Sequence, residues 1–359
     1  MRIALVNVTK PESGTGDGVT EYTYRLYEKL RRIKGNKVSL FYSIKETKRN
    51  NIRGLLYTQT LFRHKLKPLL EGNYDIIHIT NQEVGFVARA VKNSNSKAKV
   101  VTTIHDTMRL RSELHKGLMQ KSYNVFVSRS IHDAIKFSEF IIFYESGTEE
   151  NIKKLCRIKN YANIPLGIKD DIIKTKIPKR KKHNRFVVGY LGSFMYSKNV
   201  IMILKAARLM LKDKQYQFKI YGTGAERDNL LKYKEDHDLD NVEFMGFAQE
   251  SKKRQIYDSF DAFAWPALGT PHNFPPLEAM ARGLPVIASK KGEYIKEIRA
   301  NLLLANDEYD LVKTIRSIRE NGYDKKFAKK ATAYARSISW DETAGKTMSV
   351  YRRIIKDAD

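Results

Sequence analysis

The chain has 359 residues, of which 42% are hydrophobic and 11% aromatic, a composition typical of globular proteins and not of disordered ones. The length is sufficient for two domains, each with its own core. The net charge is +26, from 66 basic and 40 acidic residues. We therefore expect a polyanionic neighbour, either nucleic acid, an anionic membrane face or a phosphorylated ligand. A highly charged surface of the kind found in thermophile proteins is the alternative.

Cysteine content and hydropathy indicate the cellular compartment in which we expect the protein. Cys156 is the only cysteine, so an internal disulfide is excluded and a reducing compartment fits. No apolar run approaches the length of a membrane span, and the opening MRIALVNV is expected to be a strand and not a signal peptide. We expect a cytoplasmic protein, soluble or peripheral at the inner face of the membrane.

Short apolar runs alternate with helical patterns in the first half of the chain. The helical patterns include Thr20–Ile33 and Gln120–Phe137. The apolar runs predict buried strands at Ile3–Val8, Val38–Ser43, Ile76–Ile79, Val100–Ile104, Phe140–Tyr144 and Ala162–Ile168. Strands that alternate with helices in this way are typical of parallel βαβ units.

The same pattern restarts after a basic, proline-containing stretch, KTKIPKRKKHNR (Lys174–Arg185), which we interpret as an interdomain linker. The strands predicted after it are Phe186–Leu191, Tyr216–Tyr221, Val242–Phe244, Ala262–Trp265, Pro285–Ala288 and Leu302–Leu304. A last helix is predicted from about Asp341 to Ile355. The predicted domains are therefore residues 1–170 and 186–340, joined by a linker at 171–185, with the segment 341–359 closing the chain.

Glycines mark several of the predicted strand-to-helix turns. Gly16 and Gly18 follow the first strand, and Gly222 and Gly224 follow the strand at Tyr216–Tyr221. Glycine lets the backbone approach a ligand closely, and a helix start favours an anion. After the first strand, the spacing of the glycines is not the full dinucleotide fingerprint, and no acidic residue closes the strand that follows. A flexible loop or an ordinary tight turn is the alternative reading.

Two further positions suggest contacts with a substrate. His105 ends the fourth strand at the carboxyl edge, where open α/β sheets bind ligands, and Asp106 is positioned to hold its imidazole in one tautomer. Lys198 begins the helix predicted after the strand Phe186–Leu191. A cation at the start of a helix opposes the helix dipole unless an anion lies between them. A structural histidine and an ordinary surface lysine are the alternatives, and His78, within a strand, is expected to be structural.

The most specific stretch is WPALGTPHNFPPLEAMARGLPVIAS, from Trp265 to Ser289. It predicts a strand, a polar loop, a short helix over Leu277–Ala281 that begins near Pro276, a stop at Gly283 and a second strand. The N-terminus of such a helix makes an anion site. A carboxylate on its first turn, Glu278, can accept hydrogen bonds from sugar hydroxyls beside the bound anion.

This stretch resembles the signature of glycosyltransferase family 4, Glu-Gly-Phe-Gly-x-Pro-x-x-Glu-Ala-Met-Ala-x-Gly-x-Pro-Val. The matching residues are Pro275, Glu278, Ala279, Met280, Ala281, Gly283, Pro285 and Val286. Thr270 stands where the first glutamate is expected, and Pro271, His272 and Asn273 replace Gly-Phe-Gly. The resemblance implies the GT-B fold, in which two Rossmann-like domains with doubly wound parallel sheets face a cleft and the C-terminal helix crosses back to the first domain.

The resemblance also implies roles for individual residues. Gly16 and Gly18 would touch the donor phosphate or the acceptor, His105 would face the acceptor, Lys198 would bind the diphosphate, and Glu278 would bind the ribose. Many members carry arginine where this chain has Ser193, so one positive contact is in doubt. The remaining donor contacts implied are Gly222, Gly224, Gly246, Phe247, Thr270, His272, Asn273, Phe274 and Pro275. Replacement of the first glutamate by Thr270 implies a different sugar, such as a deoxy sugar, or weakened activity.

The implied reaction is transfer of a sugar from a UDP- or GDP-linked donor to a glycan or lipid-linked acceptor, with retention of anomeric configuration. His105, Lys198 and Glu278 are the implied catalytic residues. We expect no cofactor and no metal, because no His/Cys ligand set is visible. Asp236, Asp238 and Asp240 repeat the Asp-x-Asp spacing of GT-A enzymes, but they follow a charged segment and are expected at a solvated helix end.

Other readings stay open at this point. A nucleotide-sugar epimerase with the same fold is one alternative, and a nucleotide-sugar-binding protein with weak activity is another, given Thr270 and Ser193. Nucleic-acid binding rests on charge alone and is not expected, since no recognised module is visible. An anionic membrane surface is a further candidate partner. The residues that would bind it are Arg31, Arg32, Lys34, Lys45, Lys48, Arg53, Arg63, Lys65 and Lys67.

Overall fold

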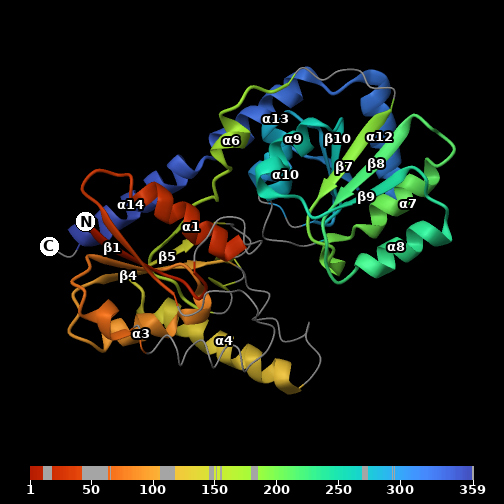
Figure 1. Cartoon of the computed structure of the whole chain (residues 1–359). Helices are drawn as coiled ribbons and strands as arrows, with labels where there is room; N and C mark the ends of the chain where they lie inside the picture. The colour runs from red at the N-terminus through yellow and green to blue at the C-terminus, as the bar shows by residue number, and fades with distance from the viewer. Residues whose placement is uncertain are drawn as a thin grey trace. The chain divides into compact units, whose positions relative to one another are not determined.

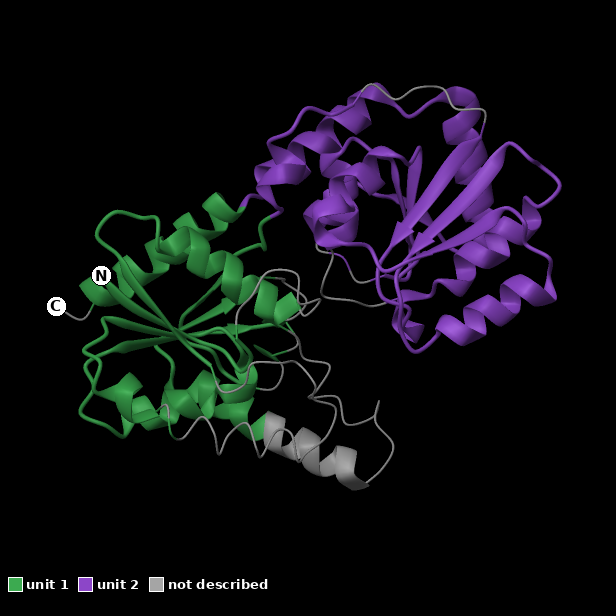
Figure 2. Cartoon of the chain, viewed as in Figure 1, with its two compact units in different colours: residues 1–167, 340–359 green, residues 168–339 purple. Residues whose placement is uncertain are grey.

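The computed structural model describes residues 1–10, 18–42, 64, 66–105, 118–144, 149–150, 152–153, 156–178, 185–268, 274–292, 294 and 296–357. The chain divides into two compact units (Figure 2). Unit 1 comprises residues 1–167 and 340–359, and unit 2 comprises residues 168–339.

Unit 1 contains a six-stranded parallel sheet with strand order β2-β1-β3-β4-β5-β6. Its strands are β1 (Arg2–Val6), β2 (Lys37–Phe41), β3 (Ile76–Ile79), β4 (Lys99–Ile104), β5 (Phe140–Phe143) and β6 (Tyr161–Asn163). Its helices are α1 (Gly18–Leu30), the 3-10 helix η1 (Gln82–Val84), α3 (Phe86–Lys92), α4 (Leu118–Phe137) and α14 (Trp340–Lys356). Figure 1 shows α1 and α14 on one face of the sheet and α3 and α4 on the other. Strands β3 and β5 are buried along their whole length because both faces of the sheet are covered.

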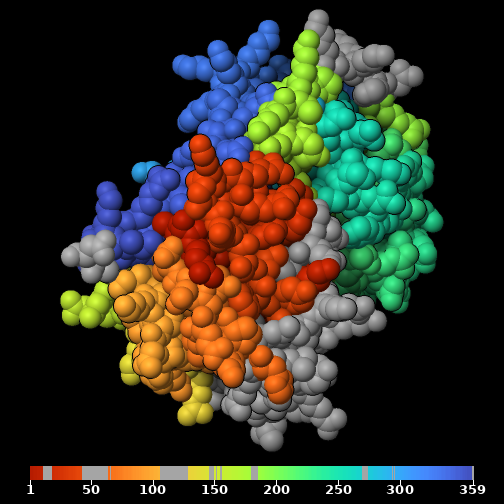
Figure 3. Space-filling model, turned by 60° about the vertical axis from the view of Figure 1, so that its left-hand side comes forward, coloured from red at the N-terminus to blue at the C-terminus, as the bar shows by residue number. Residues whose placement is uncertain are grey.

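The last helix of the chain completes unit 1. Helix α14 packs against α1, and in the space-filling view its blue surface adjoins the red N-terminal segment (Figure 3). An ion pair of 2.8 Å joins Lys29 Nζ on α1 to Asp341 Oδ1 on α14. The ring of Tyr22 on α1 lies 5.9 Å from that of Trp340, measured between centroids. The expected return of the C-terminal helix to the first domain is confirmed.

Unit 2 contains a second six-stranded parallel sheet, with strand order β12-β11-β10-β7-β8-β9. Its strands are β7 (Phe186–Leu191), β8 (Tyr216–Tyr221), β9 (Val242–Gly246), β10 (Ala262–Trp265), β11 (Val286–Ser289) and β12 (Leu303–Ala305). Its helices are α6 (Asp170–Ile173), η4 (Tyr196–Lys198), α7 (Ile201–Leu209), α8 (Arg227–Asp236), η5 (Glu250–Lys252), α9 (Lys253–Asp258), α10 (Phe274–Ala281), α11 (Lys296–Arg299), α12 (Glu308–Asn321) and α13 (Lys325–Ser337). Helices α9, α10 and α13 cover one face of the sheet, and α7, α8 and α12 cover the other (Figure 1).

The predicted strands are all present, and the sixth is shorter than expected. The strand covers Tyr161–Asn163, so the run predicted at Ala162–Ile168 contributes only Ala162 and Asn163 to the sheet. Pro165 follows, and proline has no N–H to donate to a strand ladder. Ile168 instead forms an isolated parallel bridge with Ser339, beside the second crossing between the units. The prediction missed this because apolar residues continue past the end of the strand.

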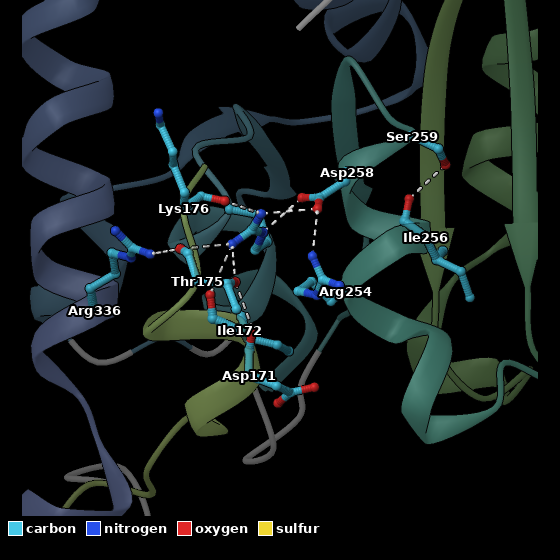
Figure 4. A network of polar contacts seen from close by, with 10 residues as sticks. Asp171, Ile172, Thr175, Lys176, Arg254, Ile256, Asp258, Ser259 and Arg336 are labelled. Carbon is cyan, nitrogen blue, oxygen red and sulfur yellow. Dashed lines mark hydrogen bonds and ion pairs between the residues drawn. The ribbon is translucent and has the colours of Figure 1, made fainter. Parts of the chain in front are cut away.

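The first part of the predicted linker belongs to unit 2 in the structure. Residues 171–178 belong to unit 2, which begins at Ile168 and not at residue 186. The cause is the fully buried side chain of Arg282. Its guanidinium binds both carboxylate oxygens of Asp258, at 2.7 and 2.9 Å. It also donates to the carbonyl oxygens of Ile172, Thr175 and Lys176, at 3.1, 3.2 and 2.9 Å. Figure 4 shows the segment beside Asp258 and Arg336.

Candidate functional site

The candidate donor site lies at the carboxyl edge of the unit 2 sheet, between β7 and β10. The strand order reverses between these two strands, and open α/β sheets bind ligands in the crevice at such a switch point. The loops that follow the two strands are bonded to each other. Leu268 N donates to Ser197 O at 2.9 Å, and Asn199 Nδ2 donates to Pro266 O at 3.3 Å. The turn that carries Lys198 is therefore fixed against the segment that leads from β10 towards α10.

The sequence predicted that Lys198 begins a helix. In the structure it is instead the last residue of η4. Asn199 adopts a left-handed conformation with φ of 50°, which separates η4 from α7. The Lys198 ammonium lies 5.0 Å from the centroid of the Trp265 ring, within the range of a cation–π interaction. Trp265 is buried and stacks on Tyr190 and on Phe263, each with an interplanar angle of 16°. This aromatic stack holds the ammonium at the edge of the sheet.

Helix α10 begins at Phe274, three residues before the predicted start at Leu277. Pro275 lies in its first turn, where the missing N–H of proline is not needed. Glu278 consequently begins the second turn of the helix instead of lying on the first. Gly283, with φ of 73°, follows the helix, and its N–H donates to Met280 O at 2.9 Å, which confirms the predicted stop.

The Glu278 carboxylate is buried, with 3% of its side chain exposed. Its Oε2 atom accepts a hydrogen bond of 2.8 Å from the Tyr257 hydroxyl and lies 4.0 Å from Lys253 Nζ. Burial and the negative charge of Glu278 raise the pKa of the Tyr257 phenol well above its usual range, so that Tyr257 remains a donor. Sequence reasoning missed Tyr257 and Lys253. Their i, i+4 spacing places them on one face of α9, but nothing in the sequence indicates that this face meets Glu278.

Gly222 and Gly224 serve the packing of two loops. They have φ of 148° and 155°, and a Cβ at Gly222 would lie 1.9 Å from Gly192 O. A Cβ at Gly224 would lie 2.4 Å from Phe194 O. Phe194 N donates to Thr223 O at 2.8 Å, so the loop after β8 is bonded to the loop after β7. The glycines are required for this close approach.

Three more residues that were predicted to contact the sugar donor lie at the carboxyl edge of the unit 2 sheet. Gly246 ends β9 with φ of 71°, and its carbonyl accepts from Gly222 N at 2.8 Å. The side chain of Phe247, the next residue, is 67% exposed. Ser193 is exposed, and its carbonyl accepts from the Tyr190 hydroxyl at 3.0 Å. Unit 2 thus brings Ser193, Lys198 and the glycines of β8 and β9 to one edge of the sheet.

In unit 1, His105 follows β4 at the carboxyl edge and is buried. Its Nε2 atom lies 2.8 Å from Thr80 O, and because a carbonyl only accepts, this nitrogen carries a proton. Thr80 therefore fixes the tautomer, a role that the sequence suggested for Asp106, which lies outside the described residues. The Tyr22 ring lies at 78° to the imidazole, with 5.1 Å between the ring centroids.

His78 is structural, as expected. It is fully buried on β3, with Nδ1 2.6 Å from the Tyr351 hydroxyl on α14 and Nε2 2.7 Å from Thr103 Oγ1 on β4. Burial, together with the nearby His105, lowers the pKa of His78 to about 3. The Thr103 hydroxyl in turn lies 3.0 Å from that of Tyr22. These side chains join α14 to the interior of unit 1.

Several predicted residues lie outside the described part of the chain: Gly16, Thr270, His272 and Asn273. Gly18 is the first residue of α1, and Phe274 and Pro275 are the first two of α10. Of the basic residues proposed to face a membrane, Arg31, Arg32, Lys34 and Lys67 are described. Arg31 and Arg32 both pair with Glu28, at 2.9 and 3.3 Å.

The Asp-x-Asp repeat lies at a helix end, as expected. Helix α8 ends at Asp236, and Asp240 pairs with Lys214 at 2.6 Å. Both positions precede β9 and so belong to the amino edge of the sheet, opposite the edge that carries Lys198. Within the described ranges, His, Cys, Asp and Glu side chains form no group of three able to hold a metal ion. Within the same ranges, no helix has the length and apolar content needed to cross a membrane.

Comparison with known proteins shows which proteins the chain is similar to. The model described as glycosyl transferases group 1 matches residues 185–321. An uncharacterized glycosyltransferase of Methanocaldococcus jannaschii is 27% identical over 307 residues, which cover 80% of this chain and 77% of the relative. Sucrose-phosphate synthase from Thermosynechococcus elongatus aligns over 99% of both chains, with a TM-score of 0.80 and 18% identity. Anabaena HepE, solved in complex with UDP and glucose, aligns over 98% of this chain and 100% of its own, with a TM-score of 0.71 and 18% identity.

Proposed function

We propose that the chain is a glycosyltransferase of group 1, because the model of that family matches residues 185–321 and the fold is GT-B. We propose that it transfers a sugar from a UDP- or GDP-linked donor to a glycan or lipid-linked acceptor. We further propose that the anomeric configuration is retained and that no metal takes part. The donor class is supported by the structural relative HepE, which binds UDP.

The observation that carries the proposal is the position of Lys198 at the switch point of the unit 2 sheet. A lysine held over Trp265, on a turn bonded to the loop after β10, presents a positive charge where α/β sheets bind ligands. The other segment at this point leads into α10, and the N-terminal N–H groups of a helix favour an anion. The two features together suit a diphosphate.

Glu278 is proposed to bind the ribose hydroxyls of the donor. Its burial beside a permanent donor, Tyr257, holds the carboxylate in one place, and a carboxylate is a strong acceptor for hydroxyl groups. In this role Glu278 anchors the donor and is not a nucleophile. Phe247 and Gly246, at the end of β9, are proposed to contact the base.

The proposed reaction passes through an oxocarbenium-like transition state, as glycoside hydrolysis does, while the leaving diphosphate gains negative charge. Lys198 and the N-terminus of α10 would stabilise that charge, and such preorganised contacts are usually the largest contribution to catalysis. His105, oriented by Thr80, is proposed to face the acceptor from unit 1. The metal-independent reading is supported by the Asp-x-Asp repeat lying at the amino edge of the sheet.

A thermal-shift panel of UDP, GDP and their sugars, with and without EDTA, tests the donor assignment. A nucleotide supplied at 100 times its Kd is expected to stabilise the protein by about 2.7 kcal/mol. Protection by neither nucleotide would contradict the proposal. Incubation of the donor with and without an acceptor, followed by NMR of the anomeric centre, then tests transfer and retention. Tight nucleotide binding without turnover would instead favour the binding-protein alternative that Ser193 and Thr270 suggest.

A further inference from the structure

A chain of side chains of alternating charge leads away from Glu278. Lys253 Nζ lies 4.0 Å from Glu278 Oε2 and 3.0 Å from Glu250 Oε2. The second oxygen of Glu250 accepts a hydrogen bond from Lys169 Nζ. Lys169 is the N-cap residue of α6 and the second residue of unit 2. This series of charged side chains therefore joins α10, α9, η5 and α6 within one unit.

These charges are shielded from solvent. The exposed fractions of the four side chains are 3% for Glu278, 20% for Lys253, 29% for Glu250 and 11% for Lys169. Exposed ion pairs contribute little, but a buried carboxylate needs a compensating partner because its desolvation is costly. Burial opposes the ionisation of Glu250, but Lys253 and Lys169 outweigh it and hold the pKa of that carboxyl below its usual range. Glu250 in turn holds Lys253 close to Glu278.

We propose that Lys253 is a positioning residue for donor binding, which holds the Glu278 carboxylate in place, and that Glu250 and Lys169 hold Lys253 beside it. The proposal rests on the proposed function, since it assumes that Glu278 binds the donor ribose. It adds a residue that the family signature does not include. Lys253 acts through Glu278 and needs no contact with the donor.

The other described elements packed around α10 are not seen to place a charged side chain beside Glu278. Strands β10 and β11 read AFAW and VIAS and contribute no charged side chain. Arg282, the residue that follows α10, forms an ion pair with Asp258, and Arg336 on α13 donates to Thr175. Tyr257 is the other titratable group bonded to Glu278, and its raised pKa keeps it protonated. Among the described residues, Lys253 is the cation that an ion pair places beside Glu278.

The test measures the Kd of a nucleotide sugar at pH 7 by calorimetry, with UDP-glucose and GDP-mannose as probes. In Lys253→Met, the Kd is expected to rise by about a factor of ten, which is within the range of coupling between side chains in contact. Lys253→Arg is expected to restore the wild-type Kd.

Lys252→Met is the matched control, because it removes the same charge from the exposed neighbouring residue; its Kd is expected to equal that of the wild type. Lys169→Met is a second variant, at the far end of the row of charges, and is expected to raise the Kd by less. In a Glu278→Gln background, Lys253→Met is expected to leave the Kd unchanged.

The outcomes separate the two proposals. A wild-type protein that binds neither probe overturns the proposed function, and this inference with it. A wild-type protein that binds a probe, with both lysine variants keeping the wild-type Kd, overturns the role of Lys253 and leaves the proposed function intact. A lower melting temperature in Lys253→Met with an unchanged Kd also overturns it, because a purely structural role predicts that pattern.

Discussion

At the scale of single residues, Lys198 is the side chain on which the proposed chemistry most depends. Its place is fixed by the left-handed Asn199 and by the ring of Trp265. We predict that Lys198→Met lowers kcat by about 10²–10³, equivalent to about 2.7–4 kcal/mol, by analogy with the removal of one oxyanion donor. The measurement is product formation at saturating donor. Lys212→Met, which removes an exposed lysine, is the control, and equal turnover in the two variants would contradict the role of Lys198.

His78 gives a second prediction at this scale, on the pH dependence of stability. Its pKa is about 3 in the folded protein, against about 6.5 in an unfolded chain. Between these values the unfolded state binds a proton that the folded state does not. The stability that neutral His78 contributes is therefore complete above about pH 6.5 and decreases as the pH falls, by about 1.36 kcal/mol per pH unit.

Urea unfolding of the wild type and of His78→Gln at pH 4.5, 5.5 and 6.5 measures this slope. The wild type is expected to lose more stability than the variant over that interval. Parallel curves for the two proteins would show that His78 titrates normally in the folded state. The comparison of slopes is independent of any constant loss that the substitution itself causes.

At the scale of elements, helix α10 is tied at its far end to the segment 168–178 through Arg282. Removal of one partner of a buried ion pair typically costs about 3–5 kcal/mol, because the other charge remains buried. We predict a loss of this size in the free energy of unfolding for Arg282→Met. Arg254→Met is the control, since Arg254 lies 4.0 Å from the same Asp258 and is partly exposed. It is expected to cost about 1 kcal/mol or less.

The helices and strands were predictable where one hydrophobic pattern continued along the whole element. The buried strands of both sheets could be recognised because helices cover both faces, which leaves unbroken apolar runs. The glycines at 222 and 224 correctly indicated a strand-to-helix turn, but the carbonyls that they approach could not be inferred. The linker assignment differed from the structure for a related reason. Arg282 contacts residues 106 to 110 positions earlier in the chain, and a basic composition gives no sign of that.

The candidate site was predictable where a contiguous motif carried it. Glu278 and Gly283 belong to the family signature, and Lys198 follows the first strand of unit 2 at a recognisable distance. Lys253 and Tyr257 were missed because their partner lies 25 and 21 positions later, on another helix. Such contacts depend on the crossing of α9 and α10, which is set by packing on the sheet. Local sequence patterns do not record that crossing.

At the scale of the whole molecule, both units repeat one architecture with different connections. The order β9-β8-β7-β10-β11-β12 in unit 2 uses one continuous stretch of chain, residues 168–339. Unit 1 takes its sheet from the first 167 residues and its last helix from the end of the chain. The net charge of +26 gave no guide to either arrangement. It bears on partners and solubility, which are properties of the surface.

The crossing of α14 into unit 1 has a consequence for synthesis of the protein. His78 reaches its partner Tyr351 only 273 residues later, a delay of roughly 14–55 s at about 5–20 residues per second. Throughout that interval the nascent first domain carries the uncovered side of α1, including Tyr22, while unit 2 is still emerging from the ribosome. Unit 1 can therefore complete its packing only after the last residues of the chain have been translated.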